Sequence, residues 1–147
     1  MDKMRAMELI LEAKAKKGLT FSEIAEAVDQ HTVWTTSALL GQQQMSMAEA
    51  DAVVDLLGLD MDVARALQAP ADKGSVGALV PTDPLIHRFY EIVQVYGSTL
   101  KSIINEEFGD GVMSSIDFRL DVERVPDPAG DRVRVTMDGR FEPYRKW

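Results

Sequence analysis

Three polar side chains in the second half of the chain have types and positions that suit chemistry on an anion. Arg88 and Glu91 stand three positions apart, so they share one face if their segment is helical. A guanidinium binds the flat edge of a carboxylate-like anion well, although such a pair is more often a surface salt bridge of little energetic weight. Ser114 has no histidine nearby in sequence, so a Ser–His–Asp hydrolase is weakly supported and a turn serine is the ordinary interpretation. The spacing of these three residues alone does not decide between an anion-binding site and ordinary surface residues.

The composition excludes several other chemistries. The 147 residues contain no cysteine, which excludes disulfides, thiolate catalysis and thiolate metal sites. The two histidines, His31 and His87, have no metal-ligand spacing, so we do not expect a zinc site of the usual kind. The formal net charge of −8 repels nucleic acid and anionic membranes. With no long apolar run and no secretory signal pattern, we expect a cytoplasmic protein without a membrane partner.

The first half of the chain has the pattern of a small helical bundle. Apolar residues recur at helical spacing, and two sequences of the capping-box type, Thr20 to Glu23 and Ser46 to Glu49, mark helix starts. Gly18, Gly41 and Gly58 mark helix ends. The expected helices cover about residues 3–17, 21–29, 33–40, 47–57 and 61–67. We therefore predict a repressor-like five-helix bundle over residues 1–70.

The segment 18–41 resembles the helix-turn-helix of repressor domains, yet its charge argues against DNA binding. From Thr20 to Asp62 there is no lysine or arginine, while the same stretch has eight acidic residues. Cationic contacts to phosphate supply most of the non-specific affinity for DNA. We expect this bundle to serve packing and assembly, with no nucleic-acid partner.

The second half begins with a linker and continues with helices. Residues 71–82 are rich in small residues, proline and glycine, which is typical of a linker. Asp83 before Pro84 suits an N-cap followed by proline at the first helical position. We expect a helix from there to about Tyr96, a bend at Gly97, and a second helix over about residues 98–108.

After a turn at residues 109–111, the apolar period changes to two. Alternation from Ile116 to Val122 and from Val133 to Met137 predicts two strands, joined by a turn at residues 126–130 and followed by a turn at residues 138–139. Two strands alone do not form a stable sheet, so the hairpin needs cover, most simply from another subunit. The predicted fold class is α+β, with the helical bundle followed by a small helix-plus-two-strand domain over residues 83–147.

Two long strings in this second half resemble the signature of the cyanases (cyanate hydratases). Residues 81–97 read PTDPLIHRFYEIVQVYG, and residues 108–118 read FGDGVMSSIDF. Segments 14–17 and 39–43 match as well, so the resemblance covers nearly the whole chain. The chain departs from the family pattern at His87, where relatives often carry tyrosine, and at Glu142, where an apolar residue is common.

The resemblance implies a reaction, a site and an assembly. Cyanases couple cyanate with bicarbonate to give carbamate and carbon dioxide, and carbamate then decomposes to ammonia and a second carbon dioxide. The family needs no cofactor. Its catalytic arginine, glutamate and serine match Arg88, Glu91 and Ser114 here. It forms a homodecamer of five dimers, with active sites where subunits of different dimers meet, and its N-terminal bundle does not read DNA. The resemblance also implies that residues 83–147 form a catalytic dimerisation domain that interlocks between two subunits.

The residue types suit that reaction. Both substrates are monoanions, and joining them produces a dianion, which requires fixed positive charge and hydrogen-bond donors. Arg88 supplies the charge, and we interpret Ser114 as a hydrogen-bond donor rather than a nucleophile, because bicarbonate is the nucleophile. Glu91 could orient Arg88 or a substrate, or help to deliver a proton. Since each chain has one such arginine, two Arg88 side chains from different subunits could converge at each site.

Two other classes of function compete with this one. A helix-turn-helix transcriptional regulator with a ligand-sensing tail would fit the first half, but its recognition helix should be basic. A plain oligomerisation module without activity is the third alternative, and physical arguments from the sequence do not exclude it.

Overall fold

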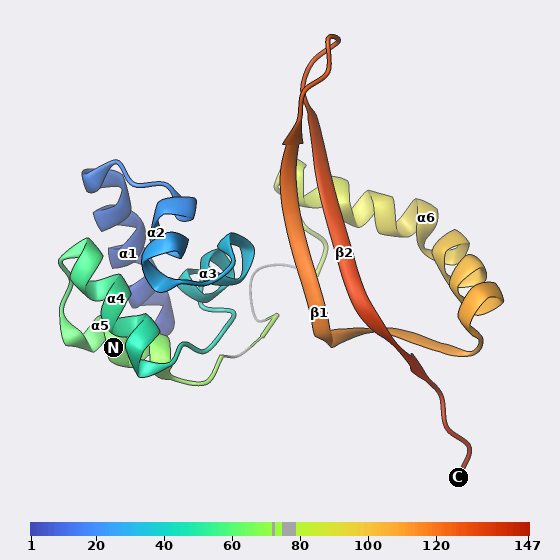
Figure 1. The fold of residues 1–147 in the computed structure, drawn as a ribbon, viewed down its shortest axis with the longest axis horizontal. Coiled ribbons are helices and arrows are strands. Elements are labelled where there is room, and N and C mark those ends of the chain that lie inside the picture. The colour runs from blue at the N-terminus through green and yellow to red at the C-terminus, as the bar shows by residue number, and fades with distance from the viewer. Residues whose placement is uncertain (72, 75–78) are drawn as a thin grey trace. The chain divides into compact units, whose positions relative to one another are not determined.

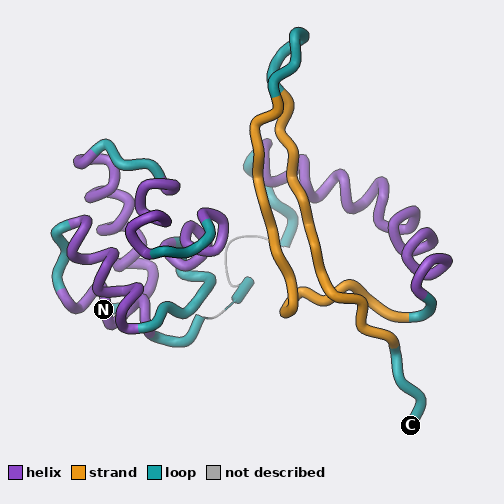
Figure 2. Tube along the Cα trace, viewed as in Figure 1, coloured by secondary structure: helices purple, strands orange, loops and turns teal. Residues whose placement is uncertain are grey.

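The computed structural model describes residues 1–71, 73–74 and 79–147. The chain divides into two compact units, Met1–Ser75 and Val76–Trp147 (Figure 1). The first unit is all helical, and the second consists of one long helix and an antiparallel hairpin (Figure 2). This is the α+β class that the sequence predicts. No helix in the described ranges has the length and apolar character needed to cross a membrane.

The first unit forms the predicted five-helix bundle around an apolar core. Its helices are α1 (Lys3–Lys17), α2 (Phe21–Val28), α3 (Thr32–Leu39), α4 (Met47–Leu57) and α5 (Met61–Gln68). Every helix contributes at least one side chain that is 1% exposed or less: Ile10, Ile24, Leu39, Val53 and Val63. Burial of such aliphatic side chains contributes about 1.5–3 kcal/mol each, which is enough for this bundle to hold its own shape.

Helix ends in this unit follow the capping chemistry predicted from the sequence. The Thr20 hydroxyl accepts from the Glu23 amide, and the Glu23 carboxylate accepts from the Thr20 amide at 2.7 Å. The Thr20 amide and, to a lesser extent, the Thr20 hydroxyl donate to the Glu23 carboxylate and lower its pKa. Ser46 and Glu49 form a second box of the same kind. Asp29 ends α2 in the left-handed conformation (φ 58°) and is the only non-glycine residue with positive φ in the described part of the chain.

The second unit contains a single long helix, α6 (Pro84–Phe108), where the sequence predicted two. Asp83 caps it as expected, accepting from the amides of Leu85 and Ile86. The predicted division into two helices at Gly97 is wrong, because α6 is one continuous helix of 25 residues that runs through this position. An interior glycine costs a helix only about 1 kcal/mol, and a single one does not break it. No residue of α6 is buried within its own chain.

The hairpin is also longer than predicted. Strand β1 (Gly111–Val125) pairs with β2 (Arg132–Pro143), and the predicted turn at residues 138–139 is wrong. Asp138 lies opposite Arg119 and Gly139 opposite Phe118, both inside β2. Glycine is needed at position 139 because the two strands approach closely there: a Cβ would lie 2.5 Å from the carbonyl oxygen of Ser114.

Between these strands lies a large β-bulge. Met113 pairs with Phe141 and Phe118 with Gly139, so residues 114–117 of β1 oppose Arg140 alone. Strand β1 turns sharply near its start in this region (Figure 2). Such bulges bend a strand, and they leave backbone amides without their ladder partners. The bulge places Ser114 at the bend.

We predict that Gly139→Ala destabilises the hairpin, because the added methyl group would overlap the Ser114 carbonyl and the Met113 side chain. Overpacking of this kind costs about 1–3 kcal/mol. Urea unfolding followed by circular dichroism at fixed protein concentration measures the change. Arg132→Ala, exposed at the start of the same strand, is the control and should shift stability by less than about 0.5 kcal/mol. Equal stability of Gly139→Ala and wild type would contradict the close packing described above.

Candidate active site

Arg88 and Glu91 lie together on the first turns of α6, as their spacing predicts. Arg88 Nη1 donates to Glu91 Oε2 at 2.9 Å. The Arg88 side chain is 71% exposed and the Glu91 side chain 43% exposed, so within its own chain the pair is open to solvent. An exposed pair of this kind contributes little to stability. The guanidinium therefore remains available to bind an anion.

His87 is part of the same cluster, a contact that the sequence reasoning missed. Its Nε2 lies 3.3 Å from Glu91 Oε1, the carboxylate oxygen that Arg88 leaves free. Its Nδ1 lies 2.9 Å from the backbone carbonyl oxygen of Pro81. The spacing of four positions between His87 and Glu91 was the available signal, because residues at i and i+4 meet on a helix. Glu91 is thus held from both sides.

Ser114 has a different environment, at the bulge of β1. It is 2% exposed and is the only buried residue in the described part of the second unit. Its Oγ accepts from the amides of Ile116 at 3.1 Å and Asp117 at 3.0 Å. Both amides belong to the bulge, so the hydroxyl satisfies donors that the ladder has lost. Two accepted hydrogen bonds leave its own hydrogen free to donate and make it a stronger donor.

An ion pair across the strands holds this bulge in place. Arg140 is the single residue opposite residues 114–117, and its Nε donates to the carboxylate of Asp117. That hydrogen bond raises the pKa of the Arg140 guanidinium, which keeps its charge throughout the physiological range. The same Asp117 donates its amide to Ser114. The orientation of the serine therefore depends on residues of both strands.

The structure brings Arg88 and Glu91 together but does not join Ser114 to them. No hydrogen bond or ion pair connects Ser114 to either residue in the described ranges. The helix carries the chain about 30 Å along its axis from Arg88 to Phe108. The six further residues to Ser114 can return at most about 20 Å, so the two Cα atoms are at least about 10 Å apart.

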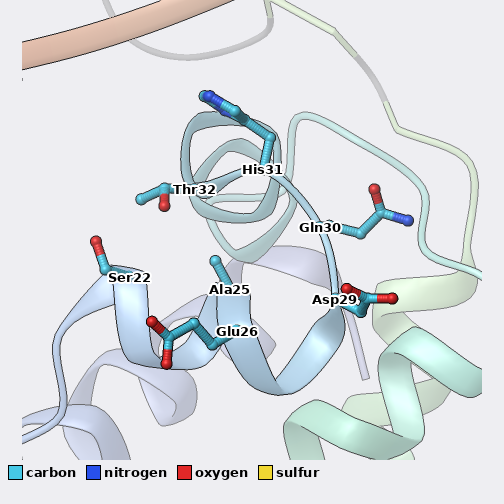
Figure 3. A pocket seen from close by; sticks show the side chains of 7 residues that line it. All are labelled: Ser22, Ala25, Glu26, Asp29, Gln30, His31 and Thr32. Carbon is cyan, nitrogen blue, oxygen red and sulfur yellow. The ribbon is translucent and has the colours of Figure 1, made fainter.

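Three cavities lined by described residues do not include Arg88, Glu91 or Ser114. One cavity of about 420 Å³ lies between the end of α6 and the hairpin, and its lining includes Phe108, Met113 and Phe141. Another, of about 490 Å³, lies in the first unit beside Ser22, His31 and Thr32 (Figure 3). Its charged lining consists of two acids, Glu26 and Asp29, which is unfavourable for an anion. Among the described residues, no three His, Cys, Asp or Glu side chains are placed to hold a metal ion.

Comparison with known proteins identifies the family. Residues 4–70 match the family described as "Cyanate hydratase, N-terminal", and residues 78–146 match "Cyanate lyase C-terminal domain". The chain is 49% identical to a cyanate hydratase of Ralstonia pickettii over the full length of both proteins. It is 53% identical to a cyanate hydratase of Mycolicibacterium vanbaalenii, covering 92% of this chain and 88% of that one.

A solved structure has the same fold. The crystal structure of cyanase from T. urticae matches with a TM-score of 0.83 and 40% sequence identity, and the match covers 94% of this chain and 96% of that one. The resemblance inferred from residues 81–97 and 108–118 is confirmed, and the alternative of a transcriptional regulator gains no support. The protein is an enzyme, and its chain belongs to the cyanate hydratase family.

Proposed function

We propose that this enzyme decomposes cyanate in a bicarbonate-dependent reaction at a site built from Arg88, Glu91 and Ser114. The observation that carries the proposal is the Arg88–Glu91 pair, exposed on a helix that buries nothing within its own chain. In a chain of this family, we interpret the Arg88 guanidinium as an anion-binding group that Glu91 orients, rather than as half of an ordinary surface salt bridge. The relatives named above are cyanate hydratases, which supports cyanate as one of the two anions.

The chemistry balances with bicarbonate as the second substrate. A bicarbonate oxygen forms a bond to the cyanate carbon, and the electron pair of a carbon–nitrogen π bond moves to nitrogen, which takes up a proton. The adduct, a dianion before this protonation and a monoanion after it, loses carbon dioxide as the hydrogen of bicarbonate passes to nitrogen, which leaves carbamate. A second proton on the carbamate nitrogen then releases ammonia and a second carbon dioxide. The overall reaction consumes two protons. We propose that neither a metal nor an organic cofactor takes part.

Each residue then has a role that follows from its contacts. Arg88 offsets the repulsion between the two anions, which grows as water leaves the site. Ser114 donates its free hydrogen to a substrate oxygen, because its Oγ already accepts two amides. Glu91 orients the Arg88 guanidinium through the 2.9 Å contact. Holding the two anions close together supplies most of the remaining rate gain.

We propose that the working unit is an oligomer, and that it is a decamer of five dimers. Along α6, ten large apolar side chains are exposed in the single chain: Leu85, Ile86, Phe89, Ile92, Val93, Val95, Tyr96, Leu100, Ile103 and Phe108. Apolar surface on this scale marks an interface. The separation of at least about 10 Å between Arg88 and Ser114 in one chain favours a site whose residues come from different subunits. A cytoplasmic location remains our expectation.

The first prediction concerns the arginine. Ammonia release from cyanate should require bicarbonate, and Arg88→Ala should lower kcat/KM by about 10³-fold or more, as expected for loss of a charge that stabilises the transition state. Arg88→Lys keeps the charge but loses the planar fork, so it should recover only part of the activity. Coupled ammonia assays with and without added bicarbonate measure both effects. Arg134→Ala, which removes an exposed pair with Glu123 on the hairpin, is the matched control and should remain active.

Loss of activity in Arg88→Ala has to be separated from loss of assembly. Size-exclusion chromatography with light scattering should give the wild-type mass for Arg88→Ala and for the control. Bicarbonate-independent ammonia release by the wild type, or full activity of Arg88→Ala in an intact assembly, would overturn the proposed function.

The second prediction concerns sharing of the site. Ser114→Ala should also be inactive, since it removes the donor and leaves the amides of Ile116 and Asp117 without their acceptor. If each site takes Arg88 and Ser114 from different subunits, co-expressed Arg88→Ala and Ser114→Ala chains should regain up to about a quarter of wild-type activity, since intact sites then re-form by random mixing. Mixed assemblies that stay as inactive as either parent would show that one chain supplies both residues.

A further inference from the structure

The bulge of β1 is larger than an ordinary one, so the sheet alone constrains it little. Residues 114–117 oppose Arg140 alone, whereas an ordinary bulge places two residues opposite one. Regular pairing resumes only at Phe118, opposite Gly139. The orientation of the Ser114 hydroxyl inside the bulge therefore depends on the side chains that span it more than on the regular ladder.

Two contacts in series connect Arg140 to the serine hydroxyl. Arg140 Nε donates to the Asp117 carboxylate, which has no other hydrogen-bond or ion-pair partner among the described residues. The backbone amide of the same Asp117 donates to Ser114 Oγ at 3.0 Å. The guanidinium therefore holds residue 117 in place, and residue 117 holds the acceptor side of the serine hydroxyl.

The two amides that Ser114 accepts decide where its hydrogen points. A serine hydroxyl has one hydrogen and two lone pairs, and its hydrogen rotates to suit its partners. The amides of Ile116 and Asp117 occupy both lone pairs, which leaves one direction for the hydrogen. If residue 117 moves away, one lone pair becomes free and the hydrogen gains other directions. The donor would then be oriented for only part of the time.

The exposure of the ion pair indicates that it contributes little to the stability of the fold. The Arg140 side chain is 74% exposed and the Asp117 side chain 60% exposed within the chain. Exposed ion pairs of this kind have little effect on the free energy of unfolding. Removal of the pair should therefore leave the hairpin folded, so its effect on turnover can be measured separately from unfolding.

We propose that Arg140 is a positioning residue of the reaction, which acts through Asp117 to hold the Ser114 hydroxyl in the orientation that donates to a substrate oxygen. The proposal rests on the proposed function, which gives Ser114 that role. Arg140 fixes the direction of a donor and does not itself bind the two anions. It therefore differs in kind from Arg88, whose charge offsets their repulsion.

The kinetic test removes each partner of the ion pair. Arg140→Ala and Asp117→Ala should each lower kcat by about 10-fold with little change in either KM, because a misdirected donor stabilises the transition state less well. The double variant should be no worse than either single one, since both changes break the same contact. Arg140→Lys keeps a cationic donor and should recover part of the lost kcat. A purely structural role would not separate kcat from KM in this way.

The same hairpin offers a matched control in a second exposed Arg–Asp pair. Arg124 Nε lies 3.7 Å from Asp131 Oδ2, and the Arg124 side chain is 82% exposed. Arg124→Ala should keep the wild-type kcat. Wild-type kcat in Arg140→Ala would overturn the proposal. So would a higher KM for bicarbonate in Arg140→Ala that Asp117→Ala does not share, because it would mean that the guanidinium binds an anion directly.

Hydrogen exchange separates this proposal from the proposed function, because it needs no substrate. In the intact assembly, mass spectrometry of peptides spanning residues 114–118 should show faster exchange in Arg140→Ala than in the wild type. Ser114→Ala, which removes the acceptor of both amides, sets the size of the effect. Unchanged exchange in Arg140→Ala would refute the positioning role whether or not cyanate is the substrate. Faster exchange, with no bicarbonate-dependent turnover by the wild type, would overturn only the proposed function.

Discussion

The second unit buries almost nothing on its own, and this constraint governs the rest of the structure. Ser114 is its only buried residue among those described, and α6 has no buried residue over 25 positions. The first unit, by contrast, closes a core to which every helix contributes. A two-stranded sheet and one helix do not bury enough apolar surface to offset the entropy of ordering them. The fold of the second unit therefore requires apolar cover beyond its own chain.

Ser114, the one buried side chain among the described residues of the second unit, is held by backbone hydrogen bonds rather than by an apolar core. The bulge frees the amides of Ile116 and Asp117, and the serine hydroxyl accepts both. Gly139 allows the opposite strand to approach the serine carbonyl, and Arg140 anchors Asp117. A side chain that is ordinarily a mobile surface group is thereby oriented by the backbone around it. The arrangement suits a hydrogen-bond donor and does not require a neighbouring base.

Local signals in the sequence predicted the elements well. Both capping boxes, the Asp83 cap and the change to a period of two appear in the structure as expected, because each depends on residues a few positions apart. The two errors concern glycines, Gly97 and Gly139. A glycine permits a turn, a helix interior or a close approach, and only the surrounding packing selects among them. At Gly139 the carbonyl oxygen of Ser114 lies too close to leave room for a Cβ atom, a contact that the sequence does not reveal.

The site residues likewise include some contacts that the sequence predicts and some that it does not. The pairing of Arg88 with Glu91 follows from helical spacing, and the same rule would have paired His87 with Glu91. The bulge around Ser114 could not be foreseen, since it depends on the register between residues 113–118 and 139–141. The identification of all three residues rested on the strings around them rather than on their spacing.

The exposed length of α6 also has a consequence for the order of folding. In the first unit α2 packs on α3 and α4 packs on α5, while α1 packs on α4 and α5. All these contacts lie within one chain, so the unit can form without a partner. The second unit gains its cover only by encounter with another chain, so its final packing is a second-order process whose rate rises with chain concentration. A newly made chain would complete its first half alone and wait, with apolar side chains in contact with water, until it meets a partner.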